Sequence, residues 1–316
     1  MRGMKFRKIF AMMLILTTMF TLVACSTANK EDKNSVEANV GDKATNTNNE
    51  NKSNDNKGND NNETEDVAKE LTGTVTITGS TSVEKILLDM ADEFMAFNPD
   101  VEINYIGTGS SAGIEDSILG VNDIGASSRQ LKDSELAQGL ETVVFAYDGI
   151  ALITNPKNPV SDLTMDQILK IFSGQITNWS EVGGNDANLI VVSREGASGT
   201  RGAFEELTGL EDVGLTDSAT VVEGNGNVQA TVAGNENAIG YVSFSFINDS
   251  VKALTIEGVK ANADEVKASK YFLSRPFLFS YKPENLSDLT KEFLEFVVSA
   301  EAQQVAVEQH GGIRID

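Results

Sequence analysis

Four short segments of this 316-residue chain place hydroxyl side chains next to glycine or alanine, a combination that can bind a small oxyanion. The segments are Gly79-Ser80-Thr81-Ser82, Gly109-Ser110-Ser111-Ala112-Gly113, Ala126-Ser127-Ser128-Arg129 and Ala197-Ser198-Gly199-Thr200-Arg201. Hydroxyl and backbone N–H groups donate hydrogen bonds to anionic oxygens, and arginine adds a positive charge at the end of two segments. The residue types therefore indicate an oxyanion site that needs no metal.

The elements expected around these segments place them at the starts of helices. Apolar, β-like runs over 74–78, 101–106 and 189–192 lead into at least three of them, and helix-like spacing of apolar residues follows. First-turn N–H groups have no acceptor within the helix, and the helix dipole adds about half a positive charge there. One such segment is ordinarily a helix cap, but four together favour anion binding.

The order of the elements indicates an α/β protein of two lobes. Strand-like and helix-like segments alternate along the globular part, as in largely parallel sheets that bind ligands at strand ends. The runs 142–154 and 275–281 are suited to cross between two units. We expect one lobe from 71–147 with 274–316 and a second from 148–273, with a cleft between them. Helices are expected over 82–97, 110–119, 165–172, 200–208, 228–233 and 286–309.

The N-terminus has the pattern of a secretory signal. Four basic residues among the first eight precede an apolar run over 9–23, which is too short for a comfortable bilayer span. The tetrapeptide Leu22-Val23-Ala24-Cys25 resembles a bacterial lipobox. We expect residues 1–24 to be a signal peptide, and Cys25, the only cysteine, to be the acylated first residue of the mature protein. No thiol then remains for a disulfide, zinc or catalysis.

Residues 25–70 have a composition that is typical of disorder. They include twelve asparagines, many charged residues and no aromatic residue. Such a segment cannot bury enough apolar surface to offset the entropy of the chain. We therefore expect a flexible tether between a lipid anchor and the globular part.

The net charge argues against nucleic acid as a partner. The full chain carries −22 at neutral pH, and loss of the four basic residues in 1–24 would change this to −26. Such a surface repels nucleic acid and anionic lipid at long range. An anion inside a closed pocket is a different case, because charges beyond about 8 Å are screened at physiological salt.

Other classes of ligand and activity have less support. The segment 107–113 approximates a dinucleotide-binding glycine motif, but its third glycine is one residue late, and no P-loop motif occurs. The only histidine, His310, lies close to the C-terminus, so no base is placed to activate a serine. Acidic residues are spread along the chain rather than clustered. We expect no catalytic residue, no metal and no cofactor.

Several motifs give the chain a family resemblance. Over essentially all of 73–312 it resembles the PstS family, the phosphate-binding lipoproteins of bacterial ABC phosphate importers. The motifs are Ile77-Thr78-Gly79-Ser80-Thr81-Ser82, Tyr105-Ile106-Gly107-Thr108-Gly109-Ser110-Ser111, Asp123-Ile124-Gly125-Ala126-Ser127-Ser128, Ile171-Phe172-Ser173-Gly174 with Trp179, Arg194-Glu195-Gly196-Ala197-Ser198-Gly199-Thr200, and Ala238-Ile239-Gly240-Tyr241-Val242. The resemblance implies a two-lobed, periplasmic-binding-protein-like α/β fold (type II), with the ligand in the cleft between lobes joined by crossing strands.

The resemblance also implies which residues contact phosphate. Arg194 would supply the fixed positive charge, and hydroxyl and N–H groups would supply the other donors. The residues carried over by position are Thr81, Ser82, Ser110, Ser128, Arg194, Ser198, Gly199 and Thr200. Hydrogen bonds to a charged ligand contribute about 1.5–3 kcal/mol each, so half a dozen would exceed the roughly 8 kcal/mol of micromolar binding. The surplus offsets dehydration of the anion.

One position departs from the family pattern. Many members have an aspartate where this chain has Ser128, and that carboxylate accepts the proton that phosphate carries and sulfate lacks. Serine repels a fully ionised oxyanion far less, so selection of phosphate over sulfate needs another acceptor. Asp148 could be that acceptor or a turn residue beside Gly149. Arg129 could be a second cation in the pocket or an external ion-pairing residue.

Together these observations predict a monomeric binding protein, lipid-anchored on the extracellular face of the cell membrane of a Gram-positive bacterium. It would capture inorganic phosphate by hinge closure and deliver it to the permease subunits of an ABC transporter. The alternatives are a binding protein for another tetrahedral oxyanion such as sulfate, a secreted phosphatase, and an anion-responsive sensor or adhesin.

Lipid attachment at Cys25 can be tested by one substitution. A Cys25→Ser variant is expected to leave the membrane fraction, because the acylated thiol is the anchor expected after removal of 1–24. Fractionation of cells that produce the wild type and the variant measures this. A variant that stays membrane-bound contradicts lipidation.

Overall fold

The structure is a computed structural model that describes residues 70–315. The predicted signal peptide (1–24) and the predicted lipidation site Cys25 lie outside the described residues. So does the predicted tether (25–70), apart from its last residue.

Parallel strands with covering helices make up the N-terminal part of the described chain. The elements are β1 (Gly73–Gly79), α1 (Glu84–Phe97), β2 (Val101–Ile106), α2 (Ser110–Leu119), β3 (Ile124–Ser127) and α3 (Asp133–Leu136). Strand β1 lies between β2 and β3 and pairs with both in parallel. Ile86, Met90 and Phe94 lie on one buried face of α1, and Asn98 before Pro99 ends the helix. These bounds agree closely with the predicted elements.

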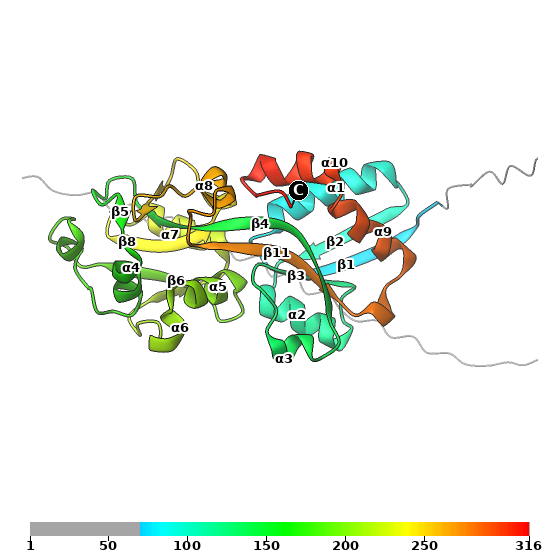
Figure 1. Ribbon diagram of the computed structural model, residues 1–316, viewed down its shortest axis with the longest axis horizontal. Helices are drawn as coiled ribbons and strands as arrows, with labels where there is room; N and C mark the ends of the chain where they lie inside the picture. The colour runs from blue at the N-terminus through cyan, green and yellow to red at the C-terminus, as the bar shows by residue number, and fades with distance from the viewer. Residues whose placement is uncertain (1–69, 316) are drawn as a thin grey trace, which may run out of the picture. The chain divides into compact units, whose positions relative to one another are not determined.

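Two antiparallel strands, β4 (Glu141–Thr154) and β11 (Ser274–Tyr281), run through the middle of the sheet. The first part of β4 pairs with β11 and its last part pairs with β8. Figure 1 shows both strands passing from the elements around β1 to those around β8. The predicted crossing segments are confirmed, but Asp148 and Gly149 lie inside β4 rather than at a turn. Gly149 is required there because a Cβ would lie 2.0 Å from the ring of Phe244.

The second group of parallel strands is centred on β6, which pairs with β7 and β8. The elements of this part are β5 (Asp162–Leu163), α4 (Met165–Phe172), β6 (Ile190–Arg194), α5 (Gly199–Thr208), α6 (Leu210–Val213), β7 (Thr220–Val222), α7 (Gly224–Ala233), β8 (Ala238–Ser243), β9 (Lys252–Ala253), β10 (Thr255–Ile256) and α8 (Ala263–Lys267). Thr164 and Gln167 form a capping box that fixes the start of α4. The expected parallel pairing holds within each group, whereas β4 and β11 are antiparallel.

Two apolar cores lie on either side of the middle of β4. One contains buried residues between 75 and 146 and again between 277 and 307, and the other contains buried residues between 150 and 273. We call the parts of the chain around them the first lobe and the second lobe. Trp179 and Tyr241 lie in the second core. The predicted lobe boundaries, 71–147 with 274–316 and 148–273, stay a prediction, because both cores belong to one structural unit.

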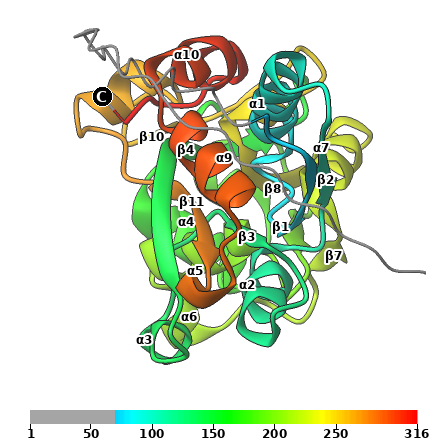
Figure 2. The same cartoon turned by 90° about the vertical axis from the view of Figure 1, so that its right-hand side faces the viewer.

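The C-terminal segment corrects one prediction. The single helix expected over 286–309 is divided into α9 (Asp288–Val297), α10 (Ala300–Ala302), a π-helical turn (Gln303–Val307) and a 3₁₀ turn (Glu308–His310). Ser299 starts a new helix, because its side chain accepts a hydrogen bond from Ala302 N at 3.2 Å. Helices α1 and α9 lie next to each other in Figure 2, with the rings of Phe94 and Phe293 5.3 Å apart.

The close approach of α2 to β1 requires a residue without a side chain at position 113, where the chain has Gly113. A Cβ at this position would lie 2.4 Å from the carbonyl oxygen of Thr78. Gly113→Ala is therefore expected to lower the free energy of unfolding by about 1–3 kcal/mol, measured by denaturant unfolding.

Gly226 in α7 is the matched control, because no atom lies within 4 Å of a Cβ built there. Gly226→Ala should leave the free energy of unfolding unchanged or raise it by up to about 1 kcal/mol, since alanine is the better helix former. Equal stability of the two variants would show that α2 can move away from β1.

Candidate functional site

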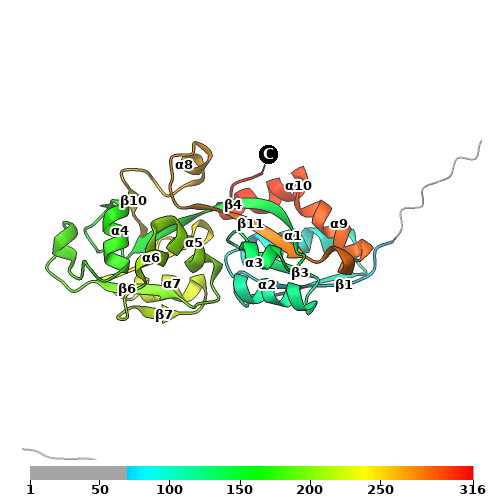
Figure 3. The same ribbon diagram turned by 60° about the horizontal axis from the view of Figure 1, so that its bottom comes forward.

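The starts of helices from both lobes meet at one place. Helix α2 of the first lobe begins at Ser110, and α5 and α7 of the second lobe begin at Gly199 and Gly224. Figure 3 shows α2 and α5 on either side of the boundary between the lobes, near β4 and β11. Ser111 N donates to Ala197 O at 3.1 Å across this boundary. The place therefore combines first-turn N–H donors with the positive ends of helix dipoles.

Hydroxyl groups from both lobes form a connected set at this place. The Oγ of Ser82 lies 2.7 Å from the Oγ1 of Thr200 in the other lobe. Ser80 Oγ donates to Ser128 Oγ at 2.7 Å, and Ser110 Oγ accepts from Ser128 N at 3.0 Å. Thr81 is linked to this set by Asn225 Nδ2, which donates to both Thr81 Oγ1 and Ser82 Oγ. Five of the predicted ligand residues belong to what we call the hydroxyl cluster, namely Thr81, Ser82, Ser110, Ser128 and Thr200, together with Ser80.

Gly199 brings the two lobes together at the cluster. A Cβ built on Gly199 would lie 2.1 Å from Ser110 Oγ and 2.8 Å from Ser128 Oγ, both in the first lobe. Only a residue without a side chain allows this approach. The close contact brings the first turn of α5 next to hydroxyl groups of the other lobe.

Arg194 at the end of β6 places a buried positive charge beside the cluster. Its side chain is 1% exposed, and Nη2 donates to Thr81 Oγ1 at 3.3 Å. Nε and Nη2 bind the Glu195 carboxylate at 2.8 and 2.6 Å. Burial disfavours the charged form of Glu195, but the hydrogen bonds and charge of Arg194 outweigh it and hold the pKa of Glu195 below its usual value. Nη1 of Arg194 is buried and has no hydrogen-bond partner within the described residues.

A second buried arginine, Arg275 on β11, also contacts the cluster. Its Nη2 donates to Ser82 Oγ at 3.2 Å, and its Nη1 donates to Ser128 O at 3.2 Å. Nη2 and Nε bind Asp148 Oδ2 at 2.8 and 3.1 Å. Burial lowers the pKa of Arg275, Asp148 opposes this shift, and a guanidinium stays charged at neutral pH.

Asp148 is fully engaged by donors. Oδ2 accepts two bonds from Arg275, and Oδ1 accepts from Ser243 Oγ at 3.0 Å and Phe244 N at 3.3 Å. Burial raises the pKa of Asp148, and the charge of Arg275 opposes the shift. Four donors occupy about four lone-pair positions, which is the capacity of an ionised carboxylate. Asp148 is therefore neither a turn residue nor a free acceptor for a ligand proton.

Asn225 in the first turn of α7 links the cluster to the second lobe. Its Nδ2 donates to Ser82 Oγ at 3.0 Å and to Thr81 Oγ1 at 3.3 Å, and its Oδ1 accepts from Ser243 N at 3.0 Å. Sequence reasoning missed both Asn225 and Arg275. The signal for Arg275 was a charged residue at the start of an apolar crossing strand.

Two further predicted residues make contacts of their own, and their roles toward a ligand stay predictions. The Oγ of Ser198 accepts from Arg201 N at 3.2 Å and caps α5, so it fixes the helix start. Arg129 binds both carboxylate oxygens of Glu135 at 2.9 and 2.7 Å, and its Nη2 donates to Ser111 Oγ at 3.1 Å. Arg129 is thus engaged in an ion pair outside the hydroxyl cluster.

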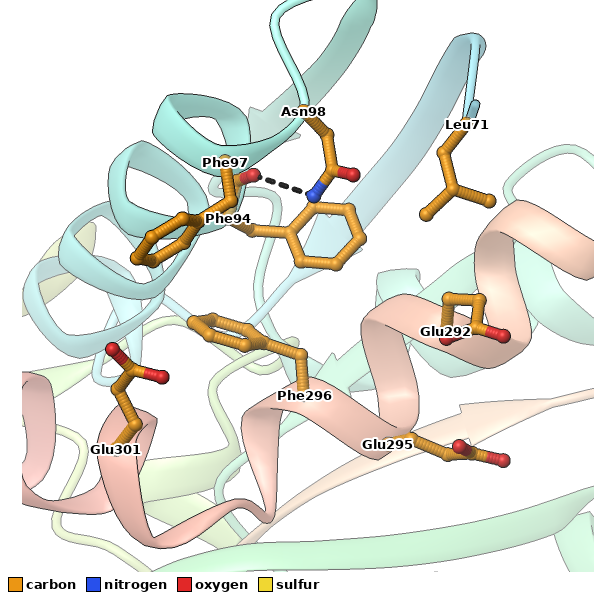
Figure 4. A pocket seen from close by; sticks show the side chains of 8 residues that line it. All are labelled: Leu71, Phe94, Phe97, Asn98, Glu292, Glu295, Phe296 and Glu301. Atoms are coloured by element: carbon orange, nitrogen blue, oxygen red, sulfur yellow. Dashed lines mark hydrogen bonds between the residues drawn. The ribbon is translucent and has the colours of Figure 1, made fainter. Parts of the chain in front are cut away.

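A separate cavity of about 320 Å³ lies in the first lobe. Figure 4 shows its lining, which consists of Leu71, Phe94, Phe97, Asn98, Glu292, Glu295, Phe296 and Glu301. Its apolar wall and its glutamates are unsuited to an oxyanion. Within 70–315, no group of three or more His, Cys, Asp or Glu residues is arranged to hold a metal ion.

The fold and the site define a class of protein that comparison also finds. Residues 53–301 match the model of the PBP superfamily domain. The phosphate-binding protein PstS of Bacillus subtilis is 30% identical over 99% of this chain and 95% of its own length. The chain belongs to the PstS family, the phosphate-binding proteins of ABC phosphate transporters.

Solved structures agree with this assignment. A Clostridium perfringens structure described as a phosphate ABC transporter substrate-binding protein with bound phosphate is 48% identical, with a TM-score of 0.75. The match covers 77% of this chain and 100% of the C. perfringens chain. An ABC-type phosphate transport receptor from Vibrio cholerae is 39% identical with a TM-score of 0.66, at the same coverage of both chains. The predicted family and the periplasmic-binding-protein-like fold are confirmed, and the family consists of binding proteins rather than enzymes.

Within residues 70–315, no helix is long and apolar enough to cross a bilayer. The predicted apolar run over 9–23 and Cys25 lie outside the described residues.

The contact between Gly199 and the first lobe generates a prediction. Gly199→Ala is expected to weaken phosphate binding by about tenfold or more, because the added methyl group separates the lobes at the hydroxyl cluster. Titration calorimetry with phosphate measures the change.

Gly196→Ala in the same loop is the matched control, since no atom lies within 4 Å of a Cβ built there. It should bind phosphate like the wild type. If Gly199→Ala also binds like the wild type, the close approach is not needed for binding.

Proposed function

We propose that this protein captures inorganic phosphate between its two lobes and delivers it to an ABC permease. The observation that carries the proposal is the buried Nη1 of Arg194, which lacks a hydrogen-bond partner in the described part of the chain and lies beside hydroxyl groups from both lobes. A buried donor without a partner costs about 1–3 kcal/mol, more for a charged group, and an anionic oxygen removes that cost. The C. perfringens relative, with its bound phosphate, supports the choice of ligand.

The proposed contacts come from both lobes. Arg194, Gly199 and Thr200 would hold the anion from the second lobe, with Ser198 fixing the helix start that supplies the N–H groups. Thr81, Ser82, Ser110 and Ser128 would hold it from the first lobe. Because the proposed contacts come from both lobes, anion binding would favour the closed arrangement of the lobes.

Selection against sulfate is the point on which the ligand choice depends. Asp148 has no remaining acceptor capacity, because its oxygens already receive four hydrogen bonds. A proton on phosphate would therefore be accepted by a hydroxyl oxygen, such as that of Ser128. Because Asp148 has no capacity left to accept a ligand proton, sulfate, another tetrahedral oxyanion, is the second candidate ligand.

The cellular setting is proposed from the N-terminal sequence and the family. Acylation at Cys25 after removal of 1–24 would hold the protein on the extracellular face of the cell membrane of a Gram-positive bacterium, with 25–70 as a tether. The protein would act as a monomer. The permease subunits would be its protein partners, and its net charge of −22 disfavours nucleic acid.

Calorimetry with phosphate, arsenate and sulfate across a pH series tests the proposal. We expect micromolar or tighter phosphate binding to the wild type and weaker sulfate binding. Arg194→Ala is expected to lose about 100-fold or more in phosphate affinity, since the variant removes a buried charge and its donors.

Lys157→Ala is the control, because this exposed residue pairs with Glu236 on the surface and should not affect binding. Preferential binding of sulfate would contradict the proposed ligand. Unchanged affinity in Arg194→Ala would remove that residue from the site. Turnover of a phosphomonoester by the purified protein would support the phosphatase alternative instead.

A further inference from the structure

The Asp148–Arg275 ion pair lies where the two crossing strands face each other. Asp148 on β4 and Arg275 on β11 are direct partners in the antiparallel ladder. Their side chains are 1% and 2% exposed, and the shortest N–O distance is 2.8 Å. A buried pair of this kind loses its hydration, so its presence is weak evidence of a purely stabilising role.

The two members of the pair are tied to different lobes. Asp148 accepts hydrogen bonds from Ser243 and Phe244, which belong to the second lobe. Arg275 donates to Ser82 and Ser128, which belong to the first lobe. The charged edge of Arg275 that Asp148 leaves uncovered therefore faces two residues expected to hold the anion.

The donors around Ser82 identify where an anion would meet Arg275. Ser82 Oγ receives Nη2 of Arg275 at 3.2 Å and Nδ2 of Asn225 at 3.0 Å, and it contacts Thr200 Oγ1 at 2.7 Å. Such a convergence of donors on one hydroxyl oxygen suits an anionic oxygen better, because charge-assisted hydrogen bonds are roughly twice as strong as neutral ones.

The charges of Arg275 and Arg194 interact with each other. The positive charge of Arg194 is one of the causes that lower the pKa of Arg275, so the two guanidinium groups repel each other. Glu195 and Asp148 each offset one of them. A dianion between the two cations would be attracted by both and would relieve their repulsion.

We propose that Arg275 is a second anion-binding cation of the site, oriented toward the ligand by Asp148. This inference rests on the proposed function, because it assigns a further residue to the same anion site. The planar guanidinium fork matches the geometry of a tetrahedral oxyanion edge, and an ammonium does not.

The test compares phosphate affinity by calorimetry with thermal stability in four variants. Arg275→Gln is expected to lower affinity by about tenfold or more, and Arg275→Lys by less, because it keeps the charge but loses the fork. Asp148→Asn should melt at a lower temperature and bind phosphate more weakly than the wild type, because Arg275 loses the carboxylate that orients it.

Tyr271→Phe is the matched control near the same strands. Its hydroxyl donates to Ile150 O at 2.8 Å, and the residue is buried in the core of the second lobe. The variant should lose stability and keep the affinity of the wild type. A loss of affinity in Tyr271→Phe equal to that in Arg275→Gln would show that affinity follows stability and would overturn the inference.

Failure of the inference is distinguishable from failure of the proposed function. If the wild type binds phosphate and Arg275→Gln binds it equally well, only the role of Arg275 is wrong. If the wild type binds sulfate and not phosphate, the ligand choice is wrong, and the same variants titrated with sulfate decide the role of Arg275. If the wild type binds neither anion, both conclusions fall.

Discussion

The buried contact between Asp148 and Arg275 is the constraint on which the boundary between the two lobes depends. Removing two charges from water is expensive unless every donor and acceptor is satisfied. Satisfying them requires the turn after β8 on one side and the loops after β1 and β3 on the other. The strands, loops and lobes therefore have to be in place together for the pair to be stable.

Local donors outweigh the overall charge in this protein. The chain carries −22, yet two buried guanidinium groups and the first turns of three helices face one small region. Distant carboxylates are screened by solvent and salt, whereas buried donors act at low effective dielectric. A strongly acidic protein can thus bind an anion without a metal, because the buried donors close to the anion contribute more to its binding energy than the distant carboxylates do.

Much of the fold and part of the site could be predicted because their signals are local. Hydroxyl and glycine residues next to helix starts identified the Ser110 and Gly199 regions, and apolar periodicity located the strands and helices. Arg275 was missed because its contact with Ser82 spans 193 residues of sequence. The helix expected over 286–309 failed for another reason, since Ser299 starts a new helix inside a continuous apolar pattern. A contact between distant segments, such as that of Arg275 with Ser82, does not change the local spacing of apolar residues, so the sequence pattern does not show it.

The irregular register between β4 and β11 has a mechanical consequence. The ladder shifts between Phe277 and Leu278, a short distance from the pair of Arg275 with Asp148. Such a shift locally increases strand twist and interrupts regular pairing. Because β4 remains hydrogen-bonded to β11 in one lobe and to β8 in the other, the lobes cannot slide past each other without breaking the ladder. Bending or twisting of the two strands keeps the ladder intact, and the irregular step is a place where this two-stranded ribbon can deform.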